Sequence, residues 1–445
     1  MADVFAVLIT LLPIVFVPWI DLAYEPPKVA GIVFLAIAAC FHAGALCLFG
    51  KKRMENMRNV FSLVDWTVIA FLAALAVSTV FSEDQLFSFL GSAERRTGFV
   101  YYLAVALLYV YIRFVFSKNA WRLLLRATIV TTTLVAVYAC AQSMGIDFPS
   151  LRQAFPLYGV SGPPRVFATF GHPNLLGAYL AAVFPFLWYV ASTDPSRFWR
   201  RFGCLALVFS VPAVFLTYSR AAWLALVVAA FAQAFLFFPR FRRMALPIFS
   251  IGLFTAILLF AVFSHGLAPS SQYRSPLVYR TLSFADISRG SALARLNEWS
   301  FAFPRIAQKP MFGHGLETYV LHSGARKKDA KETAPDYTGA DPSIADRIHQ
   351  LALDTLWSSG LVGLATFLFF FFATFRFAFR RWQGQIKSHP WTATATASVI
   401  AYIVVMQFGF DFSLSFLWLL LAAAAMQSPS CFAYEISARE DFVLE

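Results

Sequence analysis

The chain has 445 residues, of which 59% are hydrophobic and 13% charged, and its formal net charge is +12. A soluble domain has about 25% charged residues, so this composition excludes a single soluble core. The basic surplus does not indicate nucleic-acid binding, because most Lys and Arg residues lie between apolar runs and none form a basic run interleaved with aromatic residues. Five cysteines without CxxC spacing support neither a disulfide framework nor a cysteine metal site.

Apolar runs recur along the chain, each long enough to cross about 30 Å of hydrocarbon, and they predict about twelve transmembrane helices. In chain order they cover 5–22, 29–49, 63–82, 98–116, 121–143, 175–192, 202–217, 221–238, 244–265, 350–375, 391–409 and 412–427. The first run lacks a basic n-region and a cleavage site, so we interpret it as a span and not as a removable signal. The predicted fold class is an all-α polytopic membrane protein.

The basic residues predict which side of the membrane each connection faces. Alternate connections carry clusters of Lys and Arg, which the positive-inside rule places in the cytoplasm. These clusters are Lys51, Lys52, Arg53 and Arg58; Arg113, Lys118 and Arg122; Arg197, Arg200 and Arg201; Arg240, Arg242 and Arg243; and Arg376, Arg380, Arg381 and Lys387. With an even number of spans, both termini are then cytoplasmic.

One outward connection, 266–348, is long enough to fold as a small subdomain. Its segment from Ser291 to Gln308 places Leu, Trp, Phe and Ile residues at helical spacing, which predicts an amphipathic helix on the membrane face or against the bundle. We therefore divide the chain into helices one to nine at 1–265, this loop at 266–348, helices ten to twelve at 349–427 and a cytoplasmic tail at 428–445.

Arginines at the outward ends of spans need an explanation other than topology, because insertion does not favour them there. A guanidinium group can bind two phosphate oxygens at once, so several converging arginines would suit a diphosphate. Alternatively, these arginines reach lipid headgroups or pair with nearby acids. Arg220 is the strongest candidate, since apolar runs flank it closely on both sides. The others are Arg95, Arg96, Arg165, Arg274, Arg280, Arg289, Arg295 and Arg347.

His349, followed by Gln350, opens the tenth predicted span directly after the large loop. A neutral imidazole beside an arginine-lined cavity is a suitable general base for a hydroxyl nucleophile, although a histidine at a helix start is more often a cap. His172, before Pro173, is better explained by a turn, and His314, between two glycines, is ambiguous. Fingerprints of metal, nucleotide-binding and serine-nucleophile sites do not occur in a suitable context.

In their order along the chain, these features resemble the O-antigen ligase and polymerase superfamily of integral membrane glycosyltransferases. The resemblance rests on the many-span layout with one late periplasmic loop, on Gly-His-Pro-Asn-Leu-Leu-Gly at 171–177, and on Thr-Tyr-Ser-Arg at 217–220. It rests further on Arg295 with Trp299, and on the turn at 310–315. Most specific is His349-Gln350 followed by nine residues and Gly360, which is similar to the ligase pattern.

The resemblance implies transfer of a preassembled glycan from undecaprenyl diphosphate to a sugar hydroxyl, for a ligase on lipid A-core, at the periplasmic face of the bacterial inner membrane. It implies that the enzyme needs neither a metal nor another cofactor. The expected reaction is a single displacement that inverts the anomeric configuration. The catalytic residues carried over are His349, Arg220 and Arg295. Further substrate-binding candidates are Arg96, Arg165, His172, Asn174, Arg289, His314, Arg347 and Gln350.

Other functions stay open at this point. A polymerase of the same superfamily uses the same donor, and the His-Gln pattern favours the ligase. Protein O-oligosaccharyltransferases of the superfamily are typically longer at the C-terminus, so we favour them less. A lipid-linked oligosaccharide transporter would place ionisable residues near the membrane midplane, whereas the candidates here cluster at the outer face. An assembly component of the envelope would leave Arg220 and His349 without a role.

Overall fold

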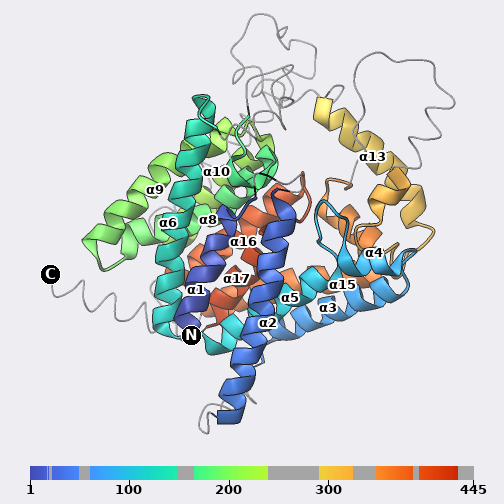
Figure 1. Ribbon diagram of the computed structural model, residues 1–445, viewed down its shortest axis with the longest axis horizontal. Coiled ribbons are helices and arrows are strands. Elements are labelled where there is room, and N and C mark those ends of the chain that lie inside the picture. Colours follow the sequence, from blue (N-terminus) through green and yellow to red (C-terminus); the bar gives the residue numbers. More distant parts are fainter. Residues whose placement is uncertain are drawn as a thin grey trace, which may run out of the picture.

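The computed structural model describes residues 1–17, 19, 23–49, 61–147, 165–238, 290–323, 347–383 and 390–428. All regular secondary structure in these ranges is helical (Figure 1), which confirms the predicted class. The predicted span at 244–265, the candidate Arg289, most of the large loop and all but the first residue of the C-terminal tail lie outside the described residues.

Seven described helices are long and apolar enough to cross a membrane: α2 (Glu25–Phe49), α3 (Leu63–Val80), α6 (Lys118–Ser143), α8 (Pro173–Thr193), α9 (Arg197–Leu216), α10 (Arg220–Phe237) and α15 (Leu351–Gln383). The shorter apolar helices are α1 (Ala2–Leu11) with η1 (Leu12–Ile14), α5 (Phe99–Val115), α16 (Pro390–Met406) and α17 (Ser415–Gln427). Each coincides with a predicted apolar run. The total of twelve spans stays a prediction.

Two of these helices differ in length from the predicted runs. The first run was predicted to span 5–22, but α1 ends at Leu11 and the chain becomes extended at Val15 after the short helix η1. Pro13 lies in η1, and proline cannot donate the hydrogen bond that would continue an α-helix. Hydropathy alone does not register this effect. In contrast, α15 extends eight residues past the predicted end at 375, to Gln383.

The interior of the bundle is built around α8, the most buried of the span-length helices. It packs against α9, α10 and α16, while α10 packs along α16, and α3 packs along α15. In Figure 1, α16 and α17 lie at the centre of the molecule. Small residues allow this close packing, as in the fully buried Ala422–Ala425 run of α17.

The predicted amphipathic helix is present as α13 (Gly290–Ile306), which packs against α15 (Figure 1). Ala302 and Trp299 join a second apolar cluster with Trp357 of α15, separate from the main core. The predicted apolar stripe is only partly buried, because Leu296 and Phe303 stay exposed. The helix therefore uses one edge of its apolar face to contact the bundle.

Helix α15 is broken at Gly360, whose backbone has φ 64° and ψ −164°. The break frees backbone groups that pair with the turn at 310–315: the Leu361 N–H donates to the Pro310 carbonyl at 2.7 Å, and the His314 N–H donates to the Trp357 carbonyl at 2.7 Å. A Cβ atom on Gly360 would lie 2.3 Å from the Met311 carbonyl oxygen. The glycine of the His-Gln motif thus serves to join this turn to α15.

Replacing Gly360 with alanine should destabilise the protein by more than about 1 kcal/mol, because alanine is strained at positive φ and its Cβ meets backbone. The measurement is the thermal unfolding midpoint of the purified protein in detergent. Gly44→Ala is the matched control, since nothing lies within 4 Å of a Cβ at that position. An equal midpoint for both variants would show that the break at Gly360 has no structural importance.

Candidate functional site

The connection between α16 and α17, residues 407–414, contacts candidate site residues from two other parts of the chain. Arg295 of α13 donates from Nη2 to the Phe408 carbonyl at 3.0 Å, and its guanidinium lies 6.0 Å from the Phe408 ring centroid. This contact fixes the position of a loop arginine relative to the bundle.

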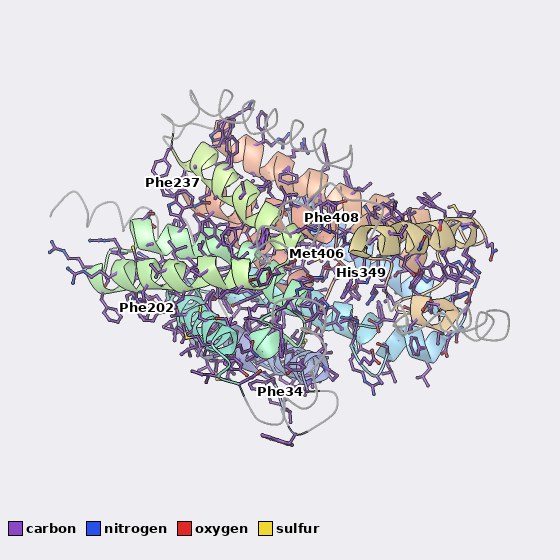
Figure 2. All side chains as sticks on the ribbon, turned by 90° about the horizontal axis from the view of Figure 1, so that it is seen from above. Phe34, Phe202, Phe237, His349, Met406 and Phe408 are labelled. Carbon is purple, nitrogen blue, oxygen red and sulfur yellow. The ribbon has the colours of Figure 1, made fainter. Side chains whose placement is uncertain are left out.

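His349 and Gln350 rest on the same connection. The His349 ring lies 5.0 Å from the Phe410 ring, centroid to centroid, and Gln350 donates from Nε2 to Gln407 Oε1 at 3.0 Å. Figure 2 shows His349 near Phe408 and Met406, beside α13. The connection therefore brings Arg295, from the loop, close to the start of α15.

Arg220 is the first residue of α10, at the end of the helix where the backbone N–H groups carry partial positive charge. Its N-cap residue, Ser219, makes no side-chain hydrogen bond to these groups. Burial lowers the pKa of Arg295, and repulsion by the nearby Arg220 lowers it further. Two like charges beside a helix N-terminus repel each other, and a bound anion would relieve that repulsion.

His349 has a left-handed backbone, with φ 60°, which non-glycine residues rarely adopt. The other described non-glycine residues with positive φ are Arg96, Ala168, Tyr218 and Glu317. Tyr218 lies two residues before Arg220, so strained residues occur at or next to both principal candidates. Strain of this kind costs about 1–3 kcal/mol and persists only where the surroundings enforce it.

Arg347 is one of the residues that hold the strained backbone of His349 in place. Its guanidinium is buried and donates to Asp354 Oδ2 at 3.2 Å and to Thr97 Oγ1 at 3.0 Å, and it also pairs with Glu317. Burial opposes the ionisation of Glu317, but Arg347 holds the pKa of that carboxyl below its usual range. The sequence predicted substrate contact for Arg347. Its position in a buried ion-pair network favours a positioning role instead, two residues before His349.

Arg165, His172 and Asn174 form a second group, at the start of α8. Arg165 donates from Nε to the Thr217 carbonyl at 2.9 Å and from Nη2 to Asn174 Oδ1 at 3.0 Å. His172 is the N-cap of α8 and accepts from the Asn174 N–H at 3.1 Å. The group thus ties the start of α8 to Thr217, three residues before Arg220.

The Gly-His-Pro-Asn-Leu-Leu-Gly run has a packing role that explains its glycines. Gly171 has φ 71° and lies against the Tyr24 ring, while a Cβ on Gly177 would lie 2.6 Å from the Ala222 Cβ. The absence of a side chain at position 177 lets α8 approach the first turn of α10. The run therefore positions the first turn of α10, and with it Arg220, against α8.

Comparison with known proteins shows that residues 205–368 match the family model described as O-antigen ligase. Over this region the chain is similar to the O-antigen ligase family. The match confirms the resemblance. Together with the apolar helices, it indicates an integral membrane protein with a glycosyltransferase-like function of ligase or polymerase type. A comparison with curated proteins gives no match.

The region matched to the O-antigen ligase family contains Arg220, Arg295 and His349, but it ends before the α16–α17 connection on which two of them rest. Two remaining candidates, Arg96 and His314, have no described contact with that connection. Arg96 is exposed, and His314 is buried with both ring nitrogens engaged. His314 therefore has internal partners in place of the predicted substrate contact.

Sequence reasoning missed the α16–α17 connection. It grouped Arg95 with the outward arginines but did not carry it into the list of substrate-binding residues, and the Arg95 guanidinium lies 4.2 Å from the Phe410 ring centroid. The available signal was Asp411, the only charged residue between the last two apolar runs. Tyr402 donates to Asp411 Oδ1 at 2.5 Å, and burial raises the pKa of Asp411 to about 6. The hydrogen bond from Tyr402 attaches the connection to α16.

Proposed function

We propose that this protein transfers a preassembled glycan from undecaprenyl diphosphate to a sugar hydroxyl of lipid A-core, at the periplasmic face of the bacterial inner membrane. The observation that carries the proposal is the closeness of Arg220 to Arg295, with Arg295 and His349 held on one segment. Such a site combines an anion-binding pair with a base.

The donor diphosphate would bind between Arg220, Arg295 and the backbone N–H groups at the start of α10. Each guanidinium can donate two parallel hydrogen bonds to phosphate oxygens, and the diphosphate removes the repulsion between the two arginines. Arg95, whose guanidinium lies over the Phe410 ring, is placed to add positive charge near the connection. A diphosphate neutralised in this way is a good leaving group without a strong general acid.

His349 would act on the acceptor. Its ring is half-buried and is oriented by Phe410. The imidazole takes the proton of the acceptor hydroxyl as the hydroxyl oxygen attacks the anomeric carbon, and the bond from that carbon to the diphosphate oxygen breaks. This single displacement inverts the anomeric configuration and leaves undecaprenyl diphosphate. In this scheme the arginines supply the positive charge, and the chemistry requires no metal.

The polyprenyl tail would lie in an apolar groove between α2 and α5. The groove has a volume of about 670 Å³ and is open to the outside of the bundle. It is lined by residues such as Ile37, Gly44 and Val100, and Val100 lies four residues after Arg96. One end of the groove therefore lies near the positive charges at the start of α5.

Filling this groove should weaken the use of long-chain donors. Gly44→Phe places a ring where nothing lies within 4 Å of the glycine, so the protein should fold while the KM for undecaprenyl-linked donor rises roughly tenfold. The KM for a short-prenyl analogue should change little. Val227→Phe, at an exposed position of α10, is the control. An equal KM for both donors in Gly44→Phe would place the tail elsewhere.

The deciding experiment for the proposed reaction offers two acceptors in competition. Purified protein is incubated with undecaprenyl-diphosphate-linked glycan, lipid A-core and unextended lipid-linked glycan. Glycan on lipid A-core is the expected product. Longer polyprenyl-linked chains would show that the protein is a polymerase, and the absence of any new glycosidic bond would exclude a transferase.

A further inference from the structure

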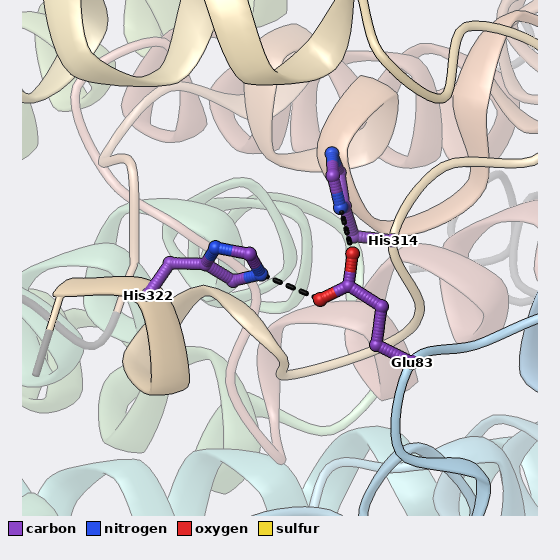
Figure 3. Close-up of side chains that lie close together, drawn as sticks. All are labelled: Glu83, His314 and His322. Atoms are coloured by element: carbon purple, nitrogen blue, oxygen red, sulfur yellow. Dashed lines mark hydrogen bonds and ion pairs between the residues drawn. The ribbon is translucent and has the colours of Figure 1, made fainter. Parts of the chain in front are cut away.

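Three side chains away from the proposed reaction site converge on one point (Figure 3). Glu83 follows α3, His314 lies in the turn after α13, and His322 lies in the helical turn at 319–323. Their ligand atoms all lie within 4.8 Å of one another. His314 Nδ1 is 2.7 Å from Glu83 Oε1, and His322 Nε2 is 2.6 Å from Glu83 Oε2.

The hydrogen bonds of His314 orient one ring nitrogen as a metal ligand would be oriented. Its Nε2 lies 2.9 Å from the Arg305 carbonyl oxygen, which can only accept, so Nε2 carries a hydrogen. Its Nδ1 faces the Glu83 carboxylate, which also only accepts when ionised. A neutral imidazole with its hydrogen on Nε2 has a lone pair on Nδ1, and this lone pair is directed at the Glu83 carboxylate, so a metal ion between them could bind both. Metal-ligating histidines typically donate their other N–H to a carbonyl in this way.

The two imidazoles are held in place by Trp357 of α15. The His314 ring stacks on the indole at 4.4 Å between centroids, and the His322 ring meets it edge-on at 5.0 Å. Trp357 is itself buried and donates from Nε1 to Thr318 Oγ1 at 3.0 Å. The ring nitrogens are therefore directed at Glu83 by packing as well as by hydrogen bonds.

Glu83 supplies the negative charge. Partial burial opposes its ionisation, but hydrogen bonds from His314, Lys309 and His322 lower its pKa to about 2. Lys309 Nζ lies 3.1 Å from Glu83 Oε1, and its side chain is partly exposed on a long flexible stem. A cation bound at the cluster would therefore compete with Lys309 for the carboxylate.

We propose that Glu83, His314 and His322 bind a zinc ion. Two imidazoles and one carboxylate suit zinc, whose bonds of about 2.0–2.2 Å leave a fourth position for water. Tetrahedral ligands then lie about 3.3 Å apart. The two His–Glu contacts, now 2.7 and 2.6 Å, would lengthen slightly, and the ligand atoms that now lie up to 4.8 Å apart would move closer together. The ion would fasten the end of α3 to the turn after α13 and, through Trp357, to α15.

The test is zinc binding to the metal-stripped full chain in detergent, without a polyhistidine tag, measured by calorimetry and by the metal content after dialysis. One zinc per chain is expected. Glu83→Gln and His322→Gln should each weaken zinc binding at least tenfold, while His42→Gln, a histidine of α2 outside the cluster, should leave it unchanged. Cobalt as a probe should give the visible spectrum of a tetrahedral site.

Lys309→Gln separates a metal site from an ion-pair cluster. Removing the competing ammonium should tighten zinc binding if the cluster is a metal site. Zinc should also raise the thermal midpoint of the wild-type protein and leave that of Glu83→Gln unchanged. Less than one zinc per chain, or wild-type affinity in Glu83→Gln and His322→Gln, would overturn the proposal and leave a hydrogen-bonded cluster without a metal.

Discussion

Arg220→Ala should reduce glycan transfer at least about 100-fold, because it removes one of the cations that would stabilise the diphosphate in the transition state. Arg220→Lys should also impair transfer, since an ammonium cannot donate two parallel hydrogen bonds to phosphate oxygens. The measurement is the rate of glycan transfer by purified protein with undecaprenyl-diphosphate-linked donor. The amount of folded protein is compared by size-exclusion chromatography.

Arg197→Ala is the matched control for Arg220, since Arg197 is the first residue of α9 as Arg220 is of α10. It should leave transfer unchanged, because the predicted topology places Arg197 on the cytoplasmic side and Arg220 on the outward side. Wild-type activity in Arg220→Ala would remove this residue from the mechanism. Full activity in the lysine variant alone would mean that a single positive charge is sufficient.

His349→Asn should lower kcat by about 10²–10⁴ and change the donor KM little, because the base acts on the acceptor hydroxyl in the transition state. Asparagine is the informative substitution, since it tolerates the left-handed backbone of position 349 better than other residues while lacking a basic nitrogen. The measurement is the steady-state transfer rate as a function of donor concentration.

His349→Ala serves as the comparison, because alanine adds backbone strain to the loss of the base. If asparagine restores transfer to the wild-type rate while alanine does not, position 349 has a conformational role and another group is the base. His42→Gln should retain activity and checks that the loss of a histidine does not by itself inactivate the protein.

The helices were predictable because runs of apolar residues and the breaks between them are local properties of the chain. Effects that depend on a single residue were harder to predict from the sequence. Pro13 shortened the first helix, and Gly360 broke α15 without interrupting its hydropathy. The predicted loop helix was found as α13, but which of its apolar residues contact the bundle depended on Trp357, some fifty residues further on.

The candidate site was predictable in its residue types but not in its partners. Arg220 and His349 were singled out by their positions at the ends of apolar runs. The same reasoning selected Arg347 and His314, which the structure pairs with internal acids. A basic residue at a helix end looks the same in sequence whether its counter-charge is a substrate or a carboxylate from a distant segment. Only the fold distinguishes the two.

The α16–α17 connection also determines when the site can exist during synthesis. Arg220, Arg295 and His349 are all translated before residue 407. A nascent chain that stops there contains every proposed catalytic group but neither the Phe408 carbonyl nor the Phe410 ring on which Arg295 and His349 rest. The proposed transferase therefore becomes competent only after its last helices have been inserted, and a truncated product in the membrane would be inert.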